Sequence, residues 1–580
     1  MKRSFQFFIF SLSALLITTL FYCSLSSSGR FEKFCNNFFC EEISSNSLTL
    51  HYTIREPEKY NIDTGYLTLG SYNVDISTQK RNLRSKYLTL FTIARGNLDK
   101  EAQVTYDLVK YCLETELERL NFYLLEEPLV PSIGIQSQLP LLLAEYTFYE
   151  EADVVNYLTL LTCLPEFFDS LLAFEELRCE QGLFTDSESV EELISYCEQL
   201  LNRTEAHFLT ETFAQRLESL SLSSEKQALY IEDHQSKLNT YVFPAYERLK
   251  EFLIAHKDDG DNQNGLFYFS GGTDYYSWLL RSEVGTDRSF GEIEGLLETA
   301  LTQDANNIAS LLKIHPNLFE ERQKITLDTS NPAGLTAYLA KRMTKDFPAV
   351  KEVSVELCAV PSSLESYLSP AFYLVPPIDD SEQNVIYLNN GCLKEGLSFF
   401  TTLAHESYPG HLYQTVYKNT SGTHPIHRLL YFGGYIEGWA TYAEQLSYQY
   451  APISSALATL LSCSRSMTLN IYAHLDLYIH AYGWTEEDCA AYLKKFGITG
   501  AASAHEIFLL VKQQPANYLK YYLGYLEICK LRQRAEKTLG ENFQLKEFHE
   551  FLLDYGPAPF SLLEKYMEEW LHSSIPDYLL

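Results

Sequence analysis

The chain has 580 residues, of which 46% are hydrophobic, and this composition is typical of a globular protein rather than a disordered one. Acidic residues outnumber basic ones by 76 to 45, which gives a net charge of −31. Such a charge argues against binding to nucleic acid or to anionic lipid and is compatible with cationic substrates. The length allows one large domain or two closely joined ones.

The N-terminus has the pattern of an export segment. Lys2 and Arg3 precede an uncharged run over residues 5–23, which is long enough to span the hydrocarbon core of a bilayer. A cleaved signal ends in small residues, whereas Phe21 and Tyr22 are bulky, and a bulky residue directly before the cysteine at position 23 disfavours a lipoprotein signal. We therefore expect an uncleaved, single-pass membrane anchor with the basic residues on the inner side.

This interpretation divides the chain into a cytoplasmic tail, an anchor, a linker and an extracytoplasmic region, at residues 1–4, 5–23, 24–46 and 47–580. The protein would then touch the membrane only through its N-terminal segment. The alternative is a cleaved signal and a secreted protein.

Long helices are expected between about residues 47 and 255, because leucines recur with a period of 3.6 and β-branched runs are few. The predicted helices are Glu101–Leu125, Leu139–Leu161, Ser187–Leu201 and Glu211–Leu253, the last with a break near Pro244. No residue pattern in this part indicates chemistry.

Three alternating stretches predict a small β-sheet at Val353–Val360, Ala371–Val375 and Val385–Leu388. They come just before the motif described next. In zinc peptidases, an edge strand at this place pairs with the extended backbone of the substrate.

A possible metal site begins at His405-Glu406, because another histidine, His411, follows within two helical turns. Two neutral imidazoles can bind zinc while the glutamate takes a proton from a metal-bound water. The two other His-Glu pairs of the chain, at 505–506 and 549–550, lack a second histidine downstream. Helix-end histidines without a metal are the alternative interpretation of the stretch.

The two histidines are six residues apart, which on a regular helix places them about 120° out of line. Pro409 and Gly410 lie between them. Because proline lacks a backbone N–H and glycine tolerates unusual dihedral angles, we expect the helix to break there and to bring His411 back to the metal.

A second helix is expected to supply the third ligand. Glu437, Thr441 and Glu444 follow a glycine-rich turn and share one helix face. Glu437 would complete a three-ligand site with one open position, and Glu444 would orient a ligand imidazole from behind. His424 and His427 form a rival metal pair, but no carboxylate stands beside them in the sequence.

Together, His-Glu-x-x-Pro-Gly-His at 405–411 and Glu-Gly-Trp-Ala-x-Tyr-x-Glu at 437–444 resemble the bacterial domain-of-unknown-function 885 family. The resemblance covers most of the chain after the N-terminus, including the stretches 271–281, 376–389 and 523–548. It implies a mainly α-helical, metallopeptidase-like fold and zinc-dependent peptidase activity with the two-His-plus-Glu ligand set.

The same resemblance implies substrate contacts. It suggests that Tyr275, Tyr276 and Arg281 approach the substrate, that the Tyr521 hydroxyl stabilises the oxyanion, and that Arg532 binds the oxyanion or a substrate terminus. By periodicity alone, Tyr521 belongs to an aromatic stripe that is usually core. The chain also departs from the family at 515–517, where Pro-Ala-Asn replaces Pro-Gly-Gln, and near residue 509, where a basic residue is missing.

The sequence thus predicts a mainly α-helical hydrolase with a small sheet before the metal helix, divided into a helical part over 47–330 and a zinc-site part over 331–580. The function expected is a zinc peptidase that uses Zn²⁺ and Glu406 as general base on a peptide substrate. A zinc hydrolase of other amides or esters, or a surface binding protein without activity, are the alternatives. The sequence gives neither the substrate nor the oligomeric state.

Overall fold

The structure is a computed structural model, and it describes residues 26–72, 75–131, 133–202, 207–360, 362, 365, 368–420 and 422–574. The cytoplasmic tail and the membrane anchor predicted at 1–4 and 5–23 lie outside the described residues. Among the described residues no single helix is long and apolar enough to cross a membrane, although the bent pair Glu151–Leu161 and Leu164–Glu180 passes by length and composition.

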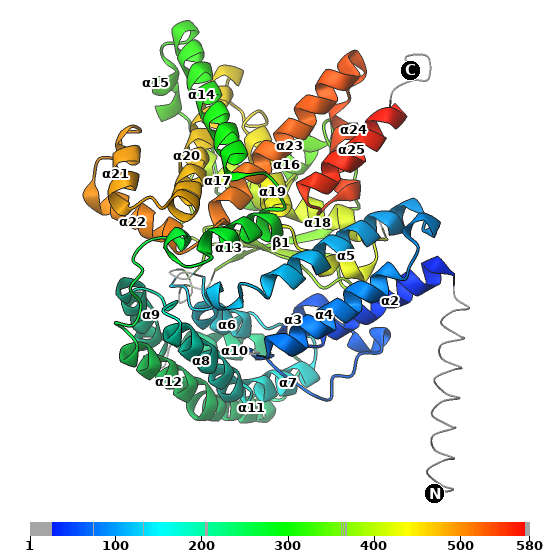
Figure 1. The fold of residues 1–580 in the computed structure, drawn as a ribbon, viewed down its shortest axis with the longest axis vertical. Helices are drawn as coiled ribbons and strands as arrows, with labels where there is room; N and C mark the ends of the chain where they lie inside the picture. The colour runs from blue at the N-terminus through cyan, green and yellow to red at the C-terminus, as the bar shows by residue number, and fades with distance from the viewer. Residues whose placement is uncertain are drawn as a thin grey trace, which may run out of the picture.

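The fold is mainly helical, as the sequence predicts, and its helices form two halves (Figure 1). The half drawn in blue to green contains α2 (Ser27–Ile43), α3 (Ser47–Thr53), α4 (Ile76–Phe91), α5 (Lys100–Arg119), α6 (Ile135–Ala144), α7 (Glu151–Leu161), α8 (Leu164–Glu180), α9 (Ser187–Leu200), α10 (Phe208–Glu218), α11 (Ser224–Lys237) and α12 (Phe243–Ala255).

The half drawn in green to red contains α13 (Gly272–Leu279), α14 (Phe290–Ile314), α15 (Leu318–Gln323), α16 (Pro332–Met343), α17 (Leu397–Glu406), α18 (His411–Thr420), α19 (Gly433–Ser447), α20 (Ser455–Tyr482), α21 (Glu486–Lys494), α22 (Ala501–Lys512), α23 (Asn517–Leu539), α24 (Leu545–Tyr555) and α25 (Phe560–Ser574).

Most of the segment predicted as a linker at 24–46 is instead a packed helix, α2, at Ser27–Ile43. In α2 the aromatic residues Phe31, Phe34 and Phe38 recur with helical spacing and are buried in the largest core cluster. The Ser26 hydroxyl caps the helix by accepting a hydrogen bond from Gly29 N at 3.1 Å. Because this cluster also contains residues from 339 to 571, the two predicted parts share one core.

Two long predicted helices are each divided by capping residues. The prediction Leu139–Leu161 is interrupted after α6, and α7 begins at a capping box formed by Glu150 and Asp153. The prediction Glu211–Leu253 is interrupted where the Ser223 hydroxyl caps α11. Near Pro244 the chain instead passes from α11 into α12 through a π-helical turn at Leu238–Val242.

The predicted sheet is present, with strands β1 (Ser354–Ala359), β2 (Ala371–Leu374) and β3 (Gln383–Leu388) in the order β1-β3-β2. β3 pairs parallel with β1, Ser354 opposite Gln383, and antiparallel with β2, Ala371 opposite Leu388. Side chains alternate between the two faces of a strand. Ile386 therefore joins the largest core cluster, while Tyr387 packs on a second cluster formed mainly by α6 to α12, which places the sheet between the two clusters.

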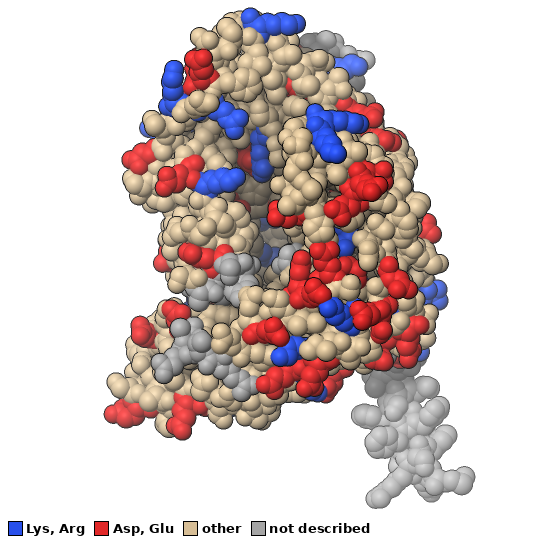
Figure 2. Space-filling view, turned by 90° about the vertical axis from the view of Figure 1, so that its left-hand side faces the viewer, with Lys and Arg blue, Asp and Glu red and all other residues tan. Residues whose placement is uncertain are grey.

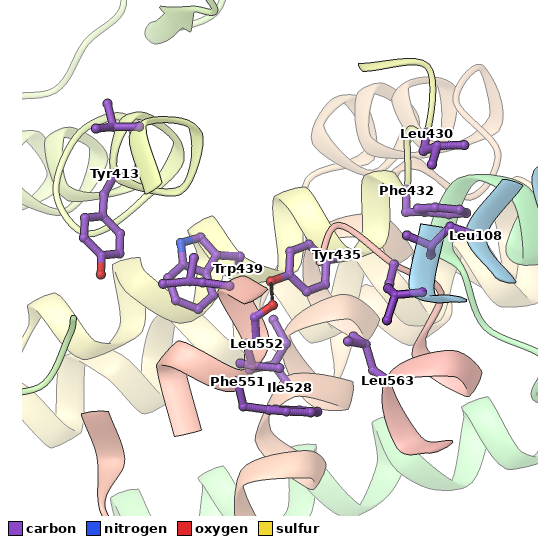
Figure 3. Close-up of a cluster of buried hydrophobic side chains, with 14 of the residues drawn as sticks. Leu108, Tyr413, Leu430, Phe432, Tyr435, Trp439, Ile528, Phe551, Leu552 and Leu563 are labelled. Atoms are coloured by element: carbon purple, nitrogen blue, oxygen red, sulfur yellow. Dashed lines mark hydrogen bonds between the residues drawn. The ribbon is translucent and has the colours of Figure 1, made fainter. Parts of the chain in front are cut away.

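Helix α19 lies within the largest core cluster (Figure 3). Its Trp439 is fully buried, and its Tyr435 hydroxyl donates a hydrogen bond to Leu552 O at 2.6 Å. Packing on several sides fixes the rotation of this helix, and with it the direction of the neighbouring Glu437 side chain. On the face shown in Figure 2, the surface is hollowed, with basic side chains in and above the hollow and acidic ones gathered below and beside it.

Candidate metal centre

The backbone leaves the helix between Glu406 and His411, as the Pro-Gly pair predicts. α17 ends at Glu406, and α18 begins at His411. In between, Gly410 N donates to Ala404 O at 3.1 Å, and a Cβ on Gly410 would lie only 1.8 Å from His405 O. Glycine is therefore required where the chain folds back on the end of α17.

Three side chains converge at this break. Glu437 Oε2 lies 3.5 Å from His405 Nε2 and 3.4 Å from His411 Nε2, and one ligand atom from each residue lies within 4.8 Å of the others. All three side chains are largely buried, with 13% to 18% of their surface exposed. α17, α18 and α19 each contribute one of them.

The spacing of these atoms fits a zinc ion. Zinc binds nitrogen and oxygen ligands at about 2.0–2.2 Å with tetrahedral geometry, which separates neighbouring ligand atoms by about 3.4 Å. In addition, Glu437 Oε2 is buried and has no hydrogen-bond partner among the described residues. A buried carboxylate that faces two imidazole nitrogens is stabilised either by protons on those rings or by a cation held between the three groups.

The histidines and carboxylates of this group strongly affect one another's pKa values. Burial lowers the pKa of His405, but the carboxylates of Glu437 and Glu444 outweigh it and raise the pKa to about 10. Burial likewise opposes ionisation of Glu437, yet His411 and His405 hold the pKa of this carboxyl below its ordinary value. The site therefore keeps an ionised carboxylate inside the protein.

Glu444 lies behind His405, as predicted for a residue that orients a ligand. Its Oε2 is 3.6 Å from His405 Nδ1, and its Oε1 accepts a hydrogen bond from Arg465 Nε at 2.8 Å. Arg465, from α20, is a residue that the sequence analysis missed. A single charged residue in a long helix gives little signal, because only the fold turns it toward Glu444.

Glu406 lies beside strand β2. Its Oε2 accepts a hydrogen bond from Tyr373 N at 3.0 Å, and the residue is 8% exposed. Burial raises the pKa of Glu406, although His405 and His411 oppose the shift. The bond fixes the carboxylate at the free edge of β2, the strand that the sequence analysis expected to meet an extended substrate.

Tyr521, unlike its neighbours in the tyrosine stripe, faces this group. Its ring is 6.3 Å from the His405 ring, and burial together with the Glu437 and Glu406 carboxylates raises its pKa. Tyr522, one residue on, is fully buried and shares a hydrogen bond with Ser466.

A cavity of about 840 Å³ connects these groups. Among the residues that line it are His405, Glu406, His411, Glu437, Glu444 and Tyr521, and the outer face of β2 forms one wall. The three possible metal ligands, the Glu406 carboxylate and the Tyr521 phenol thus all border one cavity.

The other predicted substrate contacts are not among the residues lining this cavity. Tyr276 is buried and donates to Asp476 Oδ1 at 2.7 Å, Tyr275 stacks on Trp278, and Arg281 pairs with Glu118. Helix α13, which carries the two tyrosines, packs against α5 and α20.

Arg532 is likewise engaged elsewhere. Its guanidinium donates to Glu536 Oε1 at 2.8 Å and to the Tyr442 hydroxyl at 3.1 Å, and the described cavity lining does not contain it. The oxyanion or terminus-binding role expected for Arg532 is therefore not supported by its position.

Two other groups of possible metal ligands are less well formed. His424 and His427 are not part of any metal-ligating group that the described residues form. Cys179, His256 and Asp259 do come together, but His256 already pairs with the exposed Asp259 at 2.7 Å.

The sequence profile of a family described as "Bacterial protein of unknown function (DUF885)" matches residues 67–567. The chain belongs to the DUF885 family. The search of curated proteins found no match for this DUF885 protein.

Two solved structures resemble the DUF885 chain over almost its full length. One, from Colwellia psychrerythraea, is described as a "putative lipoprotein"; it has 18% sequence identity and a TM-score of 0.81, and the match covers 95% of this chain and 100% of that one. The other, from Shewanella oneidensis, is described as a "putative lipoprotein of unknown function"; it has 16% identity and a TM-score of 0.60, with coverage of 93% and 99%. At these identities the likeness establishes the fold.

Proposed function

We propose that this DUF885 protein is a zinc-dependent hydrolase, and that its substrates are peptides. The observation that carries the proposal is the convergence of three largely buried side chains, in which Glu437 Oε2 faces the Nε2 atoms of His405 and His411 at 3.5 and 3.4 Å. Zinc bound by these three residues would polarise a carbonyl group and lower the pKa of a water molecule.

The remaining steps belong to residues of the chain. Glu406, fixed by Tyr373 N, accepts a proton from the attacking water and delivers it to the leaving amine. The Tyr521 hydroxyl donates a hydrogen bond to the carbonyl oxygen as negative charge develops on it. Glu444, tied to Arg465, keeps the His405 ring in position.

Peptides are favoured over other amides and esters because the free edge of β2 borders the cavity. Residues 369–373 line it, and an extended peptide can add to such an edge through backbone hydrogen bonds. We also propose that the catalytic region lies outside the cytoplasm, anchored by residues 5–23. The descriptions of the two similar structures as "putative lipoprotein" support a location at the cell envelope.

The proposal is tested by metal content and turnover measured on the same preparations. The parent should contain close to one zinc per chain, whereas His411→Ala and Glu437→Ala should lose the metal. His424→Ala, from the rival histidine pair, is the matched control and should keep it.

Glu406→Gln separates the base from the ligands. This variant should retain zinc, while its turnover of a mixed peptide library, read by mass spectrometry, should fall by about 10²–10⁴. A folded parent that binds no zinc, or a zinc-loaded parent that cleaves no peptide, would contradict the proposal.

A further inference from the structure

The cavity has a wall with one arginine and two histidines that the proposed chemistry does not use. The wall is the turn at Pro425–Arg428 with the preceding His424. His424, His427 and Arg428 all line the cavity, and each has a buried nitrogen without a hydrogen-bond partner among the described residues: His424 Nε2, His427 Nδ1 and Arg428 Nε. Three unpartnered polar atoms on one wall are unusual for a folded protein.

Arg428 also carries an uncompensated charge. Its Nη2 donates to Pro376 O at 2.6 Å, but none of the described carboxylates forms an ion pair with it, and its one electrostatic neighbour is the phenol of Tyr373. The other arginine of the cavity, Arg465, is paired with Glu444. In a chain with 76 acidic and 45 basic residues, a half-buried guanidinium without a carboxylate is conspicuous.

The position of Arg428 relates it to the candidate reaction centre. Tyr373 N binds Glu406, and Pro376 O, which accepts from Arg428, lies two residues past the end of β2. Glu406 and Arg428 therefore both contact the short segment from Tyr373 to Pro376, of which Tyr373 and Val375 line the cavity.

Arg428 stands where the cavity joins a second one of about 1230 Å³. Ser369, Phe372, Val375 and Arg428 line both. The second cavity extends toward α3 and α6 and has a wall of apolar residues that includes Leu139 and Leu142. A substrate that follows the edge of β2 would therefore meet a cation at the junction and an apolar surface beyond it.

We propose that Arg428 binds a carboxylate of the substrate at the junction of the two cavities. The inference rests on the proposed peptidase function and adds a substrate class to it. A planar guanidinium with free N–H donors matches a carboxylate in a bidentate arrangement, and the Nε2–H of His424, whose Nδ1 accepts a hydrogen bond from Ile426 N, can add a further one. The carboxylate is either the C-terminus of a short peptide or an Asp or Glu side chain, which share this chemistry.

Peptide pairs that differ only in charge test the proposal. One pair is an N-acetylated hexapeptide with a free C-terminal carboxylate and its C-terminal amide. A second set consists of amidated hexapeptides in which Glu or Gln is placed at each position in turn. Binding to Glu406→Gln protein is measured by calorimetry, and kcat/KM is measured with the parent.

The parent should favour the carboxylate member of at least one pair by about 10- to 100-fold, as expected for a charge-assisted hydrogen bond. Arg428→Gln should abolish that preference while the neutral peptides change little, and Arg428→Lys should retain part of it. Arg534→Gln, which changes an exposed arginine on α23, is the control and should leave the preference intact. Zinc content and melting temperature show whether each variant is folded.

The outcomes separate the two proposals. A preference for the free C-terminus identifies the terminal carboxylate, and a preference for Glu at one position identifies a side chain. If binding depends on the carboxylate and this dependence is lost in Arg428→Gln, but no peptide is cleaved, the carboxylate site at Arg428 is supported and the peptidase function is contradicted. Equal binding of charged and neutral peptides, or an equal loss of both in Arg428→Gln, would overturn the carboxylate site even if peptides are cleaved.

Discussion

Among single residues, Tyr521 differs from the other tyrosines of its helix in position and not in residue type. It lies on α23 in a row with Tyr518, Tyr522 and Tyr525, yet among these four only Tyr521 lines the cavity. Tyr518 packs on Tyr472 with ring centroids 5.1 Å apart, at a separate core. Of this row, the phenol of Tyr521 alone can reach a carbonyl oxygen in the cavity.

Tyr521→Phe should therefore slow turnover by about 10²–10³, the usual effect of removing one oxyanion donor. Zinc content and the melting temperature should stay those of the parent, because the ring and its packing remain. Steady-state kinetics with a cleaved library peptide, together with metal analysis, make the measurement.

Tyr518→Phe is the matched control for this substitution. It removes a hydroxyl from the same helix and the same row and should leave kcat unchanged. If both variants behaved like the parent, the oxyanion role would pass to another residue.

The residues of the site differed in how well the sequence could predict them. His405, His411 and Glu437 stand on elements whose direction follows from short-range spacing, and the structure brings them together. Tyr275 and Arg532 were placed by resemblance alone, and in the structure Tyr275 stacks on Trp278 of its own helix while Arg532 donates to Tyr442 of α19. Arg428 could not be found from sequence, because an arginine without a carboxylate is visible only when all neighbours are known.

At the scale of elements, the crossing of α19 and α23 sets the distance between a proposed ligand and the proposed oxyanion donor. Gly438 follows Glu437 on α19, and Gly524 lies one turn after Tyr521 on α23. A Cβ on Gly438 would lie 2.4 Å from Gly524 C, and a Cβ on Gly524 would lie 1.9 Å from Gly434 O. The two backbones touch, so there is no room for a side chain.

Gly524→Ala should push the helices apart and destabilise the protein by about 1–3 kcal/mol or more, as overpacking does. Because Tyr521 and Glu437 move with their helices, turnover should fall more than zinc content. Thermal unfolding and kinetics on the same preparation measure the two effects.

Gly295→Ala is the control for Gly524→Ala. Gly295 lies within α14, and a Cβ there would meet nothing within 4 Å. This substitution should stabilise the protein by up to about 1 kcal/mol, because alanine is the better helix former. A Gly524→Ala protein as stable and active as the parent would show that the crossing tolerates separation.

Element types were predicted more reliably than element ends. The sheet was found from its alternation, and β1 and β2 begin or end within a residue or two of the predicted bounds. The breaks before α7 and α11 were missed, because the capping residues Glu150 and Ser223 are small signals inside long leucine-rich runs. α2 was missed because its aromatic face was judged by its place beside an apolar segment rather than by its own spacing.

For the whole molecule, buried histidines dominate the expected response to acid. Burial lowers the pKa of six of them to about 3 or 4: His51, His234, His427, His474, His480 and His549. In the unfolded chain these groups titrate near pH 6.5. Between pH 6.5 and 4 the unfolded state therefore binds protons that the folded state does not.

The direction in which stability changes with pH follows from this difference in bound protons. Stability rises with pH where the unfolded state binds more protons, so it is lost as pH falls below 6.5, by about 1.4 kcal/mol per pH unit for each histidine. Buried acids act in the opposite direction, because burial raises the pKa of Glu175 to about 6 and that of Asp476 to about 7. Burial also raises the pKa of Glu126, Glu145, Asp153, Asp304 and Glu406. We expect the six histidines to have the larger effect, because the pKa of each is lowered from 6.5 to about 3 or 4.

We expect the melting temperature to fall from pH 7 to pH 5, with a net uptake of protons on unfolding at pH 5. Calorimetry over a pH series gives this uptake from the dependence of stability on pH. His234→Phe should reduce the uptake by about one proton, because His234 stacks on Phe213 and its buried Nδ1 has no partner among the described residues. A melting temperature that stays constant or rises between pH 7 and pH 5 would show that the buried histidines are charged in the folded protein or that the acids outweigh them.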